Sequence, residues 1–249
     1  MTEANVLLRN RLRQVLGPIL ATPLHPQWLI VKHGRERTDW VSRRAVGIVL
    51  DIGCADGSIR KSLTRISEYH GLDYPSTAEG LYGTRPEIFG DARRLPFQDR
   101  SFDTVMLLDV LEHVPDPELA LNEASRVLRL GGHLLLTIPF AYPLHDQPHD
   151  YQRLTEHGLA RRIHQAGLHL ELIQPVGLTA EVASANLSMA LAQGGIDAIT
   201  NRSWRMLWLP LLPFAIVLVN VLGWCFGRMW PTQQMMPGAY FVEAVRLND

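Results

Sequence analysis

The sequence predicts an α/β fold: a doubly wound, mostly parallel seven-stranded sheet with an α-helical hydrophobic insertion before the last strand. Three observations support this prediction. Short apolar runs alternate with helix-like segments, as expected for parallel βαβ units. A glycine-rich turn, "DIGCADGS" at residues 51–58, directly follows one apolar run. A long uncharged stretch separates the final alternating run from the rest of the pattern.

Seven segments have the composition of strands. The run "AVGIVLDIG" is short and apolar, and "FDTVMLL" is apolar almost throughout, as expected for buried strands of a parallel sheet. The last segment, "AYFVEAVRL", alternates in polarity. The expected strands lie at residues 45–53, 69–74, 87–90, 102–108, 133–139, 168–176 and 239–247.

One expected helix, in the segment 115–132, has clear boundary residues. Asp116 is the candidate N-cap, Pro117 suits the first turn, and Gly131 suits a left-handed stop. A stretch of this length between two strands fits a crossover helix. It therefore supports the parallel arrangement of the sheet.

Three further helices are expected. Residues 58–67 follow the glycine-rich turn, and residues 179–195 are rich in Ala and Ser. The segment 154–167 begins at the candidate cap Thr155 and ends at Gly167. These helices complete the alternation of the two element types.

The segment before the first strand is basic. Residues 1–46 contain eight basic and three acidic side chains. Residues 5–16 place leucine and valine at helical spacing with arginines between them, which predicts an amphipathic helix. The expected parts of the chain are an N-terminal cover segment (1–45), a cofactor-binding core (46–177), a hydrophobic helical insertion (178–237) and the last strand (238–249).

Composition limits the classes of function. The 249 residues include 24 basic and 25 acidic ones, so no global field favours a nucleic acid, and no nucleic-acid partner is expected. Two cysteines provide no disulfide framework, which indicates a reducing compartment. The N-terminus has no continuous apolar region typical of a signal peptide. A cytoplasmic location is expected.

The glycine-rich turn indicates the chemistry of its ligand. Gly53 and Gly57 allow a tight turn that brings the backbone against a ligand. No Lys-Ser/Thr pair follows, so the turn is not a P-loop, and Asp51 and Asp56 would repel a pyrophosphate. Asp73, which ends the second strand, is placed to accept hydrogen bonds from ribose hydroxyls. A cationic head, a ribose and no phosphate together describe S-adenosylmethionine.

Four motifs in order resemble those of class I S-adenosylmethionine-dependent methyltransferases. They are "VLDIGCADGS", "GLD", "GDARRLPFQDRSFDTVMLLDVLEHVPDP" and "EASRVLRLGGHLLLTIP". The resemblance covers about residues 46–176 and the last strand, and it extends to the small-molecule group that includes quinone-biosynthesis enzymes. It implies an enzyme that transfers a methyl group from S-adenosylmethionine.

The resemblance also implies a role for each residue at this edge of the sheet. The methionine end of the cofactor would lie against Asp51, Gly53 and Gly57, the ribose against Asp73, and the adenine against Asp91 and Ala92. Asp109 would face the methionine portion and the acceptor. Cys54 stands where the family often has a small residue, and we interpret it as a packing residue rather than a nucleophile.

Residues 139–155, "PFAYPLHDQPHDYQRLT", are expected to form the acceptor side of the site. A similar segment recurs in methyltransferases of sugar and cell-envelope gene clusters. A hydroxyl acceptor needs a base, and His145 and His149 are the candidates because the pKa of histidine lies near neutrality. Asp146 or Asp150 would orient the imidazole.

Other side chains of the acceptor segment are expected to contact the substrate. They are Tyr142, Asp150, Tyr151 and Arg153. Alternatively, the segment only shapes and closes the pocket. Pro148 interrupts the spacing between the two histidines, so no metal site is expected. His113, in "LEHVP", is expected to pack or cap.

The insertion contains 22 consecutive uncharged residues, 206–227. Arginines flank this run and tryptophans cluster at its ends, as at membrane interfaces. A single membrane pass is excluded if the last strand rejoins the sheet, and Pro210 and Pro213 interrupt a continuous helix. We therefore expect a helical hairpin or broken helix at the inner face of the cell membrane. A lid over an apolar pocket and a homodimer contact are the alternatives.

The expected function is methyl transfer to an apolar or lipid-linked small molecule. O-methylation of a glycolipid or of a polysaccharide-precursor sugar in cell-envelope biosynthesis is the leading hypothesis. The first alternative is C- or O-methylation of a prenylated quinone precursor. The second is a non-catalytic cofactor-binding scaffold, which the intact carboxylates Asp51, Asp73 and Asp91 disfavour.

Overall fold

The computed structural model describes residues 17–232 and 235–247. The expected N-terminal helix, 5–16, lies outside the described residues. The chain divides into two compact units. A sheet unit contains Glu36–Val176 and the chain from Ala239 onward, and a hairpin unit contains the chain up to Arg35 and Gly177–Gly238.

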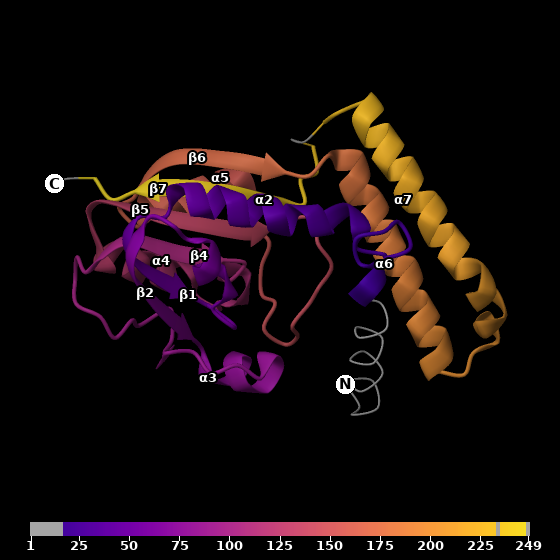
Figure 1. Cartoon of the computed structure of the whole chain (residues 1–249), viewed down its shortest axis with the longest axis horizontal. Coiled ribbons are helices and arrows are strands. Elements are labelled where there is room, and N and C mark those ends of the chain that lie inside the picture. Colours follow the sequence, from indigo (N-terminus) through magenta and orange to yellow (C-terminus); the bar gives the residue numbers. More distant parts are fainter. Residues whose placement is uncertain (1–16, 233–234, 248–249) are drawn as a thin grey trace. The chain divides into compact units, whose positions relative to one another are not determined.

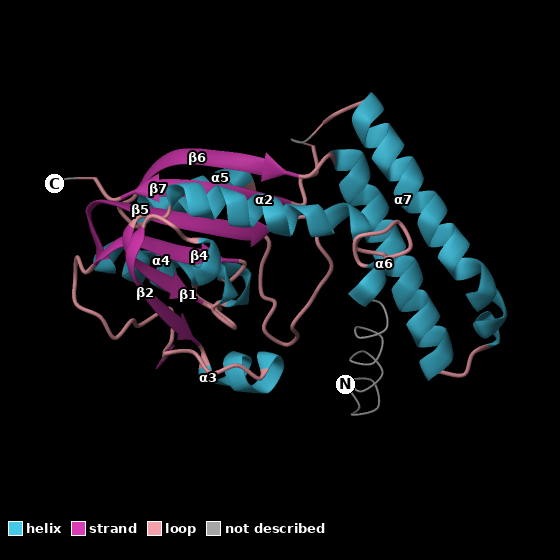
Figure 2. Cartoon of the chain, viewed as in Figure 1, coloured by secondary structure: helices cyan, strands magenta, loops and turns pink. Residues whose placement is uncertain are grey.

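The sheet unit is built on seven strands in the order β3-β2-β1-β4-β5-β7-β6 (Figures 1 and 2). The strands are β1 Gly47–Ile52, β2 Ile66–Asp73, β3 Ile88–Phe89, β4 Phe102–Leu108, β5 Leu128–Pro139, β6 His169–Val176 and β7 Ala239–Val245. β7 runs antiparallel to both of its neighbours, β5 and β6, and every other adjacent pair of strands in this sheet is parallel. The predicted fold class and all seven strands are confirmed.

The helices lie between these strands in the order expected for an α/β fold. The α-helices are α2 Trp28–Arg44, α3 Pro75–Thr77, α4 Pro117–Val127, α5 Glu156–Gln165, α6 Thr179–Thr200 and α7 Leu212–Met229. The shorter 3₁₀ or π segments are η1 Gly17–Ile19, η2 Ser58–Ser62, η3 Ala78–Tyr82, η4 Leu111–His113 and η5 Trp204–Leu211.

The α5 helix begins and ends at the predicted residues. The Thr155 side chain accepts a hydrogen bond from the Gly158 amide at 3.2 Å, and Gly167 has a φ of +74°. The helix predicted at 115–132 is shorter, because Leu128 already pairs with Phe102 of β4. Gly131 does adopt a left-handed φ of +76°, but it does so inside β5 rather than at the helix end.

The helix predicted over 58–67 is wrong. Only Ser58–Ser62 forms a single 3₁₀ segment, and β2 already begins at Ile66, which lies opposite Gly47 of β1. Pairing with β1 requires extended backbone, and it leaves too few residues for an α-helix. Conversely, α2 has no clear apolar period in the sequence because its middle, Gly34–Asp39, is polar.

Alternate residues of the central strands face two apolar layers. Leu50 belongs to the layer that includes buried side chains of α4 and α5. Its neighbour Val49 belongs to the opposite layer, where Trp40 and Val41 of α2 pack. Because both faces of the sheet are covered, the polar groups that face a cavity lie at the strand ends.

The hairpin unit consists mainly of α6 and α7, which pack side by side (Figure 1). Pro210 lies in the 3₁₀ segment η5 and Pro213 in the first turn of α7, so the uncharged run is a broken helix, as expected. Val176 at the end of β6 pairs with Ala239 at the start of β7. The insertion therefore leaves and rejoins the sheet at adjacent positions, which argues against a single membrane pass.

Within the described residues, one helical stretch is long and apolar enough to cross a membrane. It comprises Trp204–Met229, with a mean hydropathy of 2.1 in its most apolar window. Core helices of soluble proteins can have the same length and composition. Such core helices are mostly buried, whereas only 17% of this window is buried.

Candidate active site

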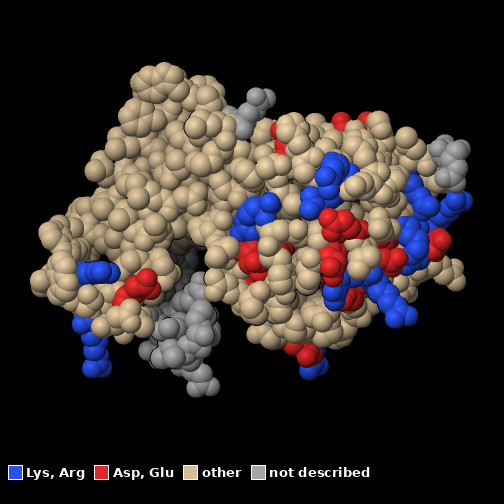
Figure 3. All heavy atoms as spheres, turned by 180° about the vertical axis from the view of Figure 1, so that it is seen from behind, with Lys and Arg blue, Asp and Glu red and all other residues tan. Residues whose placement is uncertain are grey.

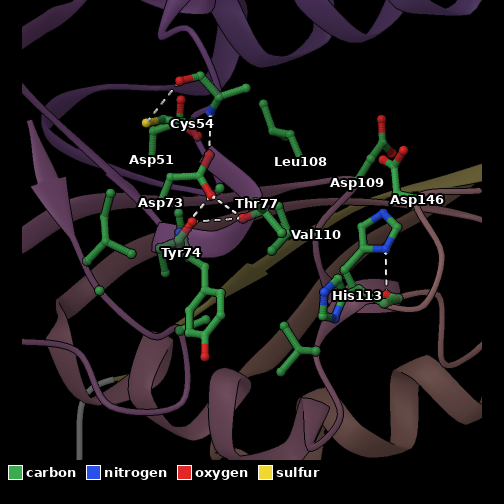
Figure 4. A pocket seen from close by; sticks show the side chains of 18 of the residues that line it. Asp51, Cys54, Asp73, Tyr74, Thr77, Leu108, Asp109, Val110, His113 and Asp146 are labelled. Atoms are coloured by element: carbon green, nitrogen blue, oxygen red, sulfur yellow. Dashed lines mark hydrogen bonds between the residues drawn. The ribbon is translucent and has the colours of Figure 1, made fainter. Parts of the chain in front are cut away.

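A cavity of about 570 Å³ opens at the carboxyl ends of β1, β2 and β4. Its lining comes from the glycine-rich turn, the ends of β2 and β3, the segment after β4 and part of the acceptor segment. In Figure 4, Asp51 and Asp73 lie on one side of this cavity and Asp109, Asp146 and His113 on the other. All lining residues belong to the sheet unit.

Asp51, at the end of β1, is a buried carboxyl that faces the cavity. It accepts a hydrogen bond from the Tyr69 hydroxyl at 2.6 Å. Burial raises the pKa of Asp51 to about 7, although this hydrogen bond and the charge of Arg37 lower it, and the charge of Asp73 adds to the rise. Such a group is stabilised by a cation placed beside it.

Gly53 is required by the close approach of the turn to the segment after β4. Its φ is +75°, and a Cβ atom there would lie 2.3 Å from Cγ2 of Val110. Gly57 also has a left-handed φ, of +64°, but it does not line the cavity. Between them, the Cys54 thiol is buried and its pKa is raised to about 12, which agrees with a packing role.

Asp73 ends β2 and is held by three donors. Its Oδ2 accepts from the Ala55 amide at 2.9 Å, and its Oδ1 accepts from the Tyr74 amide at 2.7 Å and the Thr77 hydroxyl at 3.1 Å (Figure 4). These bonds fix the carboxylate at the cavity wall. Each carboxylate oxygen can accept more than one hydrogen bond, so the group retains capacity for ligand hydroxyls.

Asp91 and Ala92 line the cavity after β3, and their contact with the adenine stays a prediction. Both oxygens of Asp91 accept from the Arg93 guanidinium, with the shortest distance 2.7 Å. The hydrogen bonds from Arg93 lower the pKa of Asp91. Arg93 also reaches Asp116 at 3.1 Å. A ligand amino group at Asp91 must therefore share the carboxylate with Arg93, a residue that sequence reasoning did not identify.

Asp109 follows β4 and has a left-handed φ of +56°. A non-glycine residue in this conformation is uncommon, and such positions cluster at functional sites. Its Oδ1 accepts from the Thr137 hydroxyl at 2.8 Å, and its Oδ2 accepts from Arg37 of α2. Arg37 lines the cavity, and its Nε is buried without a hydrogen-bond partner among the described residues. The sequence did not indicate Arg37 as a site residue, because the segment that forms α2 has no clear apolar period.

The acceptor segment divides into residues that line the cavity and residues that support them. Asp146, His149 and Tyr151 line it. Tyr142, His145, Asp150 and Arg153 do not. The site roles assigned to all of these residues stay predictions, but among the two histidines the cavity favours His149.

The supporting residues form a compact ionic group. The side chain of Asp150 is almost fully buried, and it accepts hydrogen bonds from the Arg153 guanidinium and, at 2.9 Å, from the His145 amide. Burial raises the pKa of Asp150, but the bonds from Arg153 and His145 outweigh it and lower the value to about 2. This group therefore holds the acceptor segment in place while other residues face the cavity.

His113 also lines the cavity, whereas it was predicted only to pack or cap. Its Nδ1 lies 2.8 Å from the His149 carbonyl oxygen, which can only accept, so the Nδ1 carries the proton. Burial lowers the pKa of His113. A neutral His113 therefore positions the backbone of His149, and its Nε2 presents a lone pair.

The Nε2 of His113 faces the carboxyl of Glu112. Glu112 is fully buried, neither of its carboxyl oxygens has a hydrogen-bond partner in the described part of the chain, and burial raises its pKa well above the usual range. Its Oε1 lies 3.7 Å from Nε2 of His113 and 4.0 Å from Nε2 of His145. The three groups could hold a divalent cation. The sequence did not indicate this cluster, and the expectation of no metal stays a prediction.

Comparison with known proteins decides the family. A family model described as "Methyltransferase domain" matches residues 50–136. The ubiquinone biosynthesis O-methyltransferase of Xanthomonas oryzae pv. oryzae is 30% identical over 187 residues, which cover 68% of this chain and 74% of that protein. The chain belongs to the class I S-adenosylmethionine-dependent methyltransferases. The predicted resemblance is thereby confirmed.

A second methyltransferase relative differs in length. The fatty-acid O-methyltransferase of Mycolicibacterium smegmatis is 31% identical over 135 residues, and the chain spans only 48% of its length. The cyclase SpnF has the same fold, with a TM-score of 0.54 and 18% identity over 88% of this chain and 82% of its own. The fold is therefore shared with a protein named for another reaction, so the acceptor chemistry has to be argued from the site.

The methyltransferase cofactor is S-adenosylmethionine, and the cavity fits it. Asp51 is a desolvated carboxyl with room beside it for an ammonium group. The unpartnered Nε of Arg37 suits a carboxylate, and Asp73 suits ribose hydroxyls. When bound there, the cofactor supplies an electrophilic methyl group on a sulfonium. The non-catalytic scaffold hypothesis is disfavoured by the methyltransferase domain and by the relatives named as methyltransferases.

Proposed function

We propose that this methyltransferase methylates a hydroxyl oxygen of an apolar small molecule. The observation that carries the proposal is the placement of His149 and Tyr151 at the same cavity as the cofactor carboxylates. A hydroxyl nucleophile needs a group that takes its proton, and histidine suits this role near neutral pH. The two relatives described above, both named as O-methyltransferases, support transfer to oxygen.

His149 is the proposed base. Its Nδ1 lies 3.4 Å from the Tyr151 hydroxyl, and its own backbone carbonyl accepts from His113. The ring is exposed to the cavity rather than enclosed by ion pairs, so its Nε2 is available to an acceptor hydroxyl. His145 is instead packed edge-on against His113 and Tyr142, with ring centroids 4.8 and 5.1 Å apart. We therefore assign proton transfer to His149 and support of the segment to His145.

A phenolic precursor of a prenylated quinone is the acceptor class we favour. The ubiquinone-biosynthesis relative supports this class, and its similarity covers more of the chain than that of the fatty-acid enzyme. The second candidate is a sugar hydroxyl of a glycolipid or polysaccharide precursor, supported by the polar acceptor segment 139–155. Either acceptor would be used at the cytoplasmic face of a membrane.

The purified full-length protein with S-adenosylmethionine should methylate one acceptor class in a panel. The panel contains a prenylated catechol, a long-chain fatty acid and a lipid-linked sugar, and mass spectrometry detects the gain of one methylene. We expect product with the prenylated catechol. Asp73→Ala should weaken cofactor binding by about 10- to 150-fold, and lower product formation to match at low cofactor concentration, because losing a charged acceptor costs about 1.5–3 kcal/mol.

Calorimetry provides the control for this test. Asp99 is an exposed carboxyl outside the cavity, and Asp99→Ala should bind S-adenosylmethionine as the wild type does. Product with the lipid-linked sugar alone would support a sugar hydroxyl as the acceptor instead of a phenol. Product only with the fatty acid, which accepts the methyl group on a carboxylate rather than a hydroxyl, or only with RNA or DNA added to the panel, would contradict the proposed function. Equal cofactor affinity of Asp73→Ala and wild type would also contradict it.

A further inference from the structure

The outward face of α7 has the wrong polarity for a helix in contact with water. Phe214 and Leu218 are 75% and 60% exposed, and the apolar face continues along the helix to Met229. A surface helix of a soluble protein normally directs polar side chains outward. Figure 3 shows, at its upper left, that the surface over this unit is almost free of charged side chains. The exposed face needs an apolar partner.

The inward face of α7 is made of small and polar residues. Gly223 and Gly227 form a Gly-x-x-x-Gly pair that lies against α6, and a Cβ on Gly223 would be 2.3 Å from the Ser184 side chain. Asn220 is fully buried and accepts a hydrogen bond from the Ser188 hydroxyl at 2.8 Å. Small residues and buried polar pairs between helices, with large apolar groups outside, are typical of helices packed in lipid.

The two ends of the apolar face carry aromatic side chains. Trp204 and Trp208 are exposed in η5, and Trp224 and Trp230 are exposed near the other end of α7. Tryptophan at both ends of an apolar stretch matches the interfacial region of a bilayer, where its ring contacts both apolar and polar surroundings. A buried contact between two protein copies would not require this distribution.

The basic residues at the two ends of the apolar face differ in whether they are already paired with a carboxylate. Arg228 is already engaged, because its guanidinium donates to the buried Glu181 at 3.0 Å and lies 4.0 Å from the Trp224 ring. Lys32 also pairs with Glu181. Arg202, just before η5, and Arg205, within η5, are exposed, and neither forms an ion pair among the described residues. They remain available for an anionic surface.

We propose that the outward face of η5 and α7 docks on an anionic lipid bilayer, with α7 lying in the plane of the interface. The partner helix α6 exposes Gln193 and Asp197, which suits contact with water rather than lipid. The tryptophans at both ends of this face, together with Arg202 and Arg205 at one end, then occupy the same headgroup layer. The proposal concerns attachment only and does not depend on the proposed acceptor.

Flotation of the full-length protein with vesicles tests the apolar contact. The wild type should float with vesicles of phosphatidylcholine and phosphatidylglycerol. The double variant Phe214→Glu/Leu218→Glu should bind at least about tenfold more weakly, since each lost apolar contact and each inserted carboxylate disfavours the bilayer. Leu119→Glu, at a similarly exposed leucine of α4, is the matched control and should float as the wild type does.

A second variant tests the charge contribution. Arg202→Gln/Arg205→Gln should float about as well as the wild type with pure phosphatidylcholine and several-fold less well with the anionic vesicles. Circular dichroism and S-adenosylmethionine calorimetry on every variant verify that the protein is folded. A variant that keeps cofactor binding but no longer floats has lost membrane attachment without misfolding, whereas a wild type that methylates its acceptor but does not float would contradict this proposal and leave the proposed function standing.

Two results would overturn the proposal. One is a wild type that stays monomeric in solution without lipid or detergent and does not float, which would favour a lid. The other is a stable dimer in light scattering that Phe214→Glu/Leu218→Glu converts to monomers without any effect on vesicle binding. That result would assign the apolar face to a second copy of this chain.

Discussion

At the scale of single residues, the buried Asp51 carboxyl should make cofactor binding depend on pH. Its pKa is raised to about 7 by burial, so below pH 7 it is mostly protonated and has to lose a proton before it pairs with an ammonium group. S-adenosylmethionine affinity should therefore fall by about tenfold per pH unit as the pH decreases below 7. Calorimetry between pH 5.5 and about 8 measures this dependence.

Asp51→Asn provides the control for the pH prediction. The amide does not titrate, so the variant should bind weakly with a flat profile over the same range. Tyr69, Arg37 and Asp73 surround the carboxyl, and none of them is altered by the substitution. An equally steep profile in the variant would assign the titration to another group.

His149 should be required for turnover but not for cofactor binding. His149→Ala removes the base that lines the cavity, and kcat should fall by roughly 10²–10⁴-fold. The cofactor affinity should be unchanged within about twofold, since the cofactor carboxylates are untouched. His157→Ala, an exposed histidine of α5, should be neutral in both assays.

An already ionised phenol needs no protein base. A loss of less than about fivefold in His149→Ala would therefore contradict the proposed proton transfer.

Residues that carry a local signal were predictable, and those that act through tertiary contacts were not. Asp51 and Asp73 lie at the ends of recognisable strands and Asp109 directly follows one, so their place at one edge could be foreseen. Arg37 and Glu112 could not, because their roles depend on what surrounds them. Arg37 reaches Asp109 from 72 residues away, and Glu112 is enclosed only once the acceptor segment folds over it.

At the scale of elements, the contact between α6 and α7 depends on glycine. Gly223→Leu should destabilise the hairpin unit, because even a Cβ would lie 2.3 Å from Ser184 and overpacking costs about 1–3 kcal/mol. A Cβ on Gly194, within α6, would have no described atom within 4 Å apart from the neighbouring backbone of its own helix. Gly194→Ala should therefore raise the free energy of unfolding by about 0.5–1 kcal/mol. Thermal unfolding followed by circular dichroism compares the two; equal midpoints would contradict the packing of α6 against α7.

Element boundaries followed the sequence where capping residues set them. Thr155 and Gly167 delimit α5 because their interactions are local. The helix predicted over 58–67 does not form because β2 includes its last residues. Their pairing with β1 outweighs their helix propensity.

At the scale of the whole molecule, a bound cofactor should slow hydrogen exchange of backbone amides in the sheet unit only. All lining residues of the cavity belong to that unit. With S-adenosylhomocysteine at about a hundred times its Kd, hydrogen exchange should slow by about tenfold or more at residues 51–59 and 72–77. Residues 204–230 should exchange as in the ligand-free protein. Equal protection of both regions, measured by mass spectrometry, would contradict this assignment.

The amino-acid sequence was enough to predict the family, the succession of strands along the chain and the strand ends at which the candidate cofactor carboxylates lie. These features rest on local periodicity, on turn chemistry and on motifs that are contiguous in the chain. Only the tertiary structure decided that His149 rather than His145 faces the cavity, that Arg37 joins Asp109, and that α7 directs its large apolar side chains outward. The physical reason is that burial, desolvation and facing direction belong to the packed chain, because they depend on neighbours that are distant in sequence.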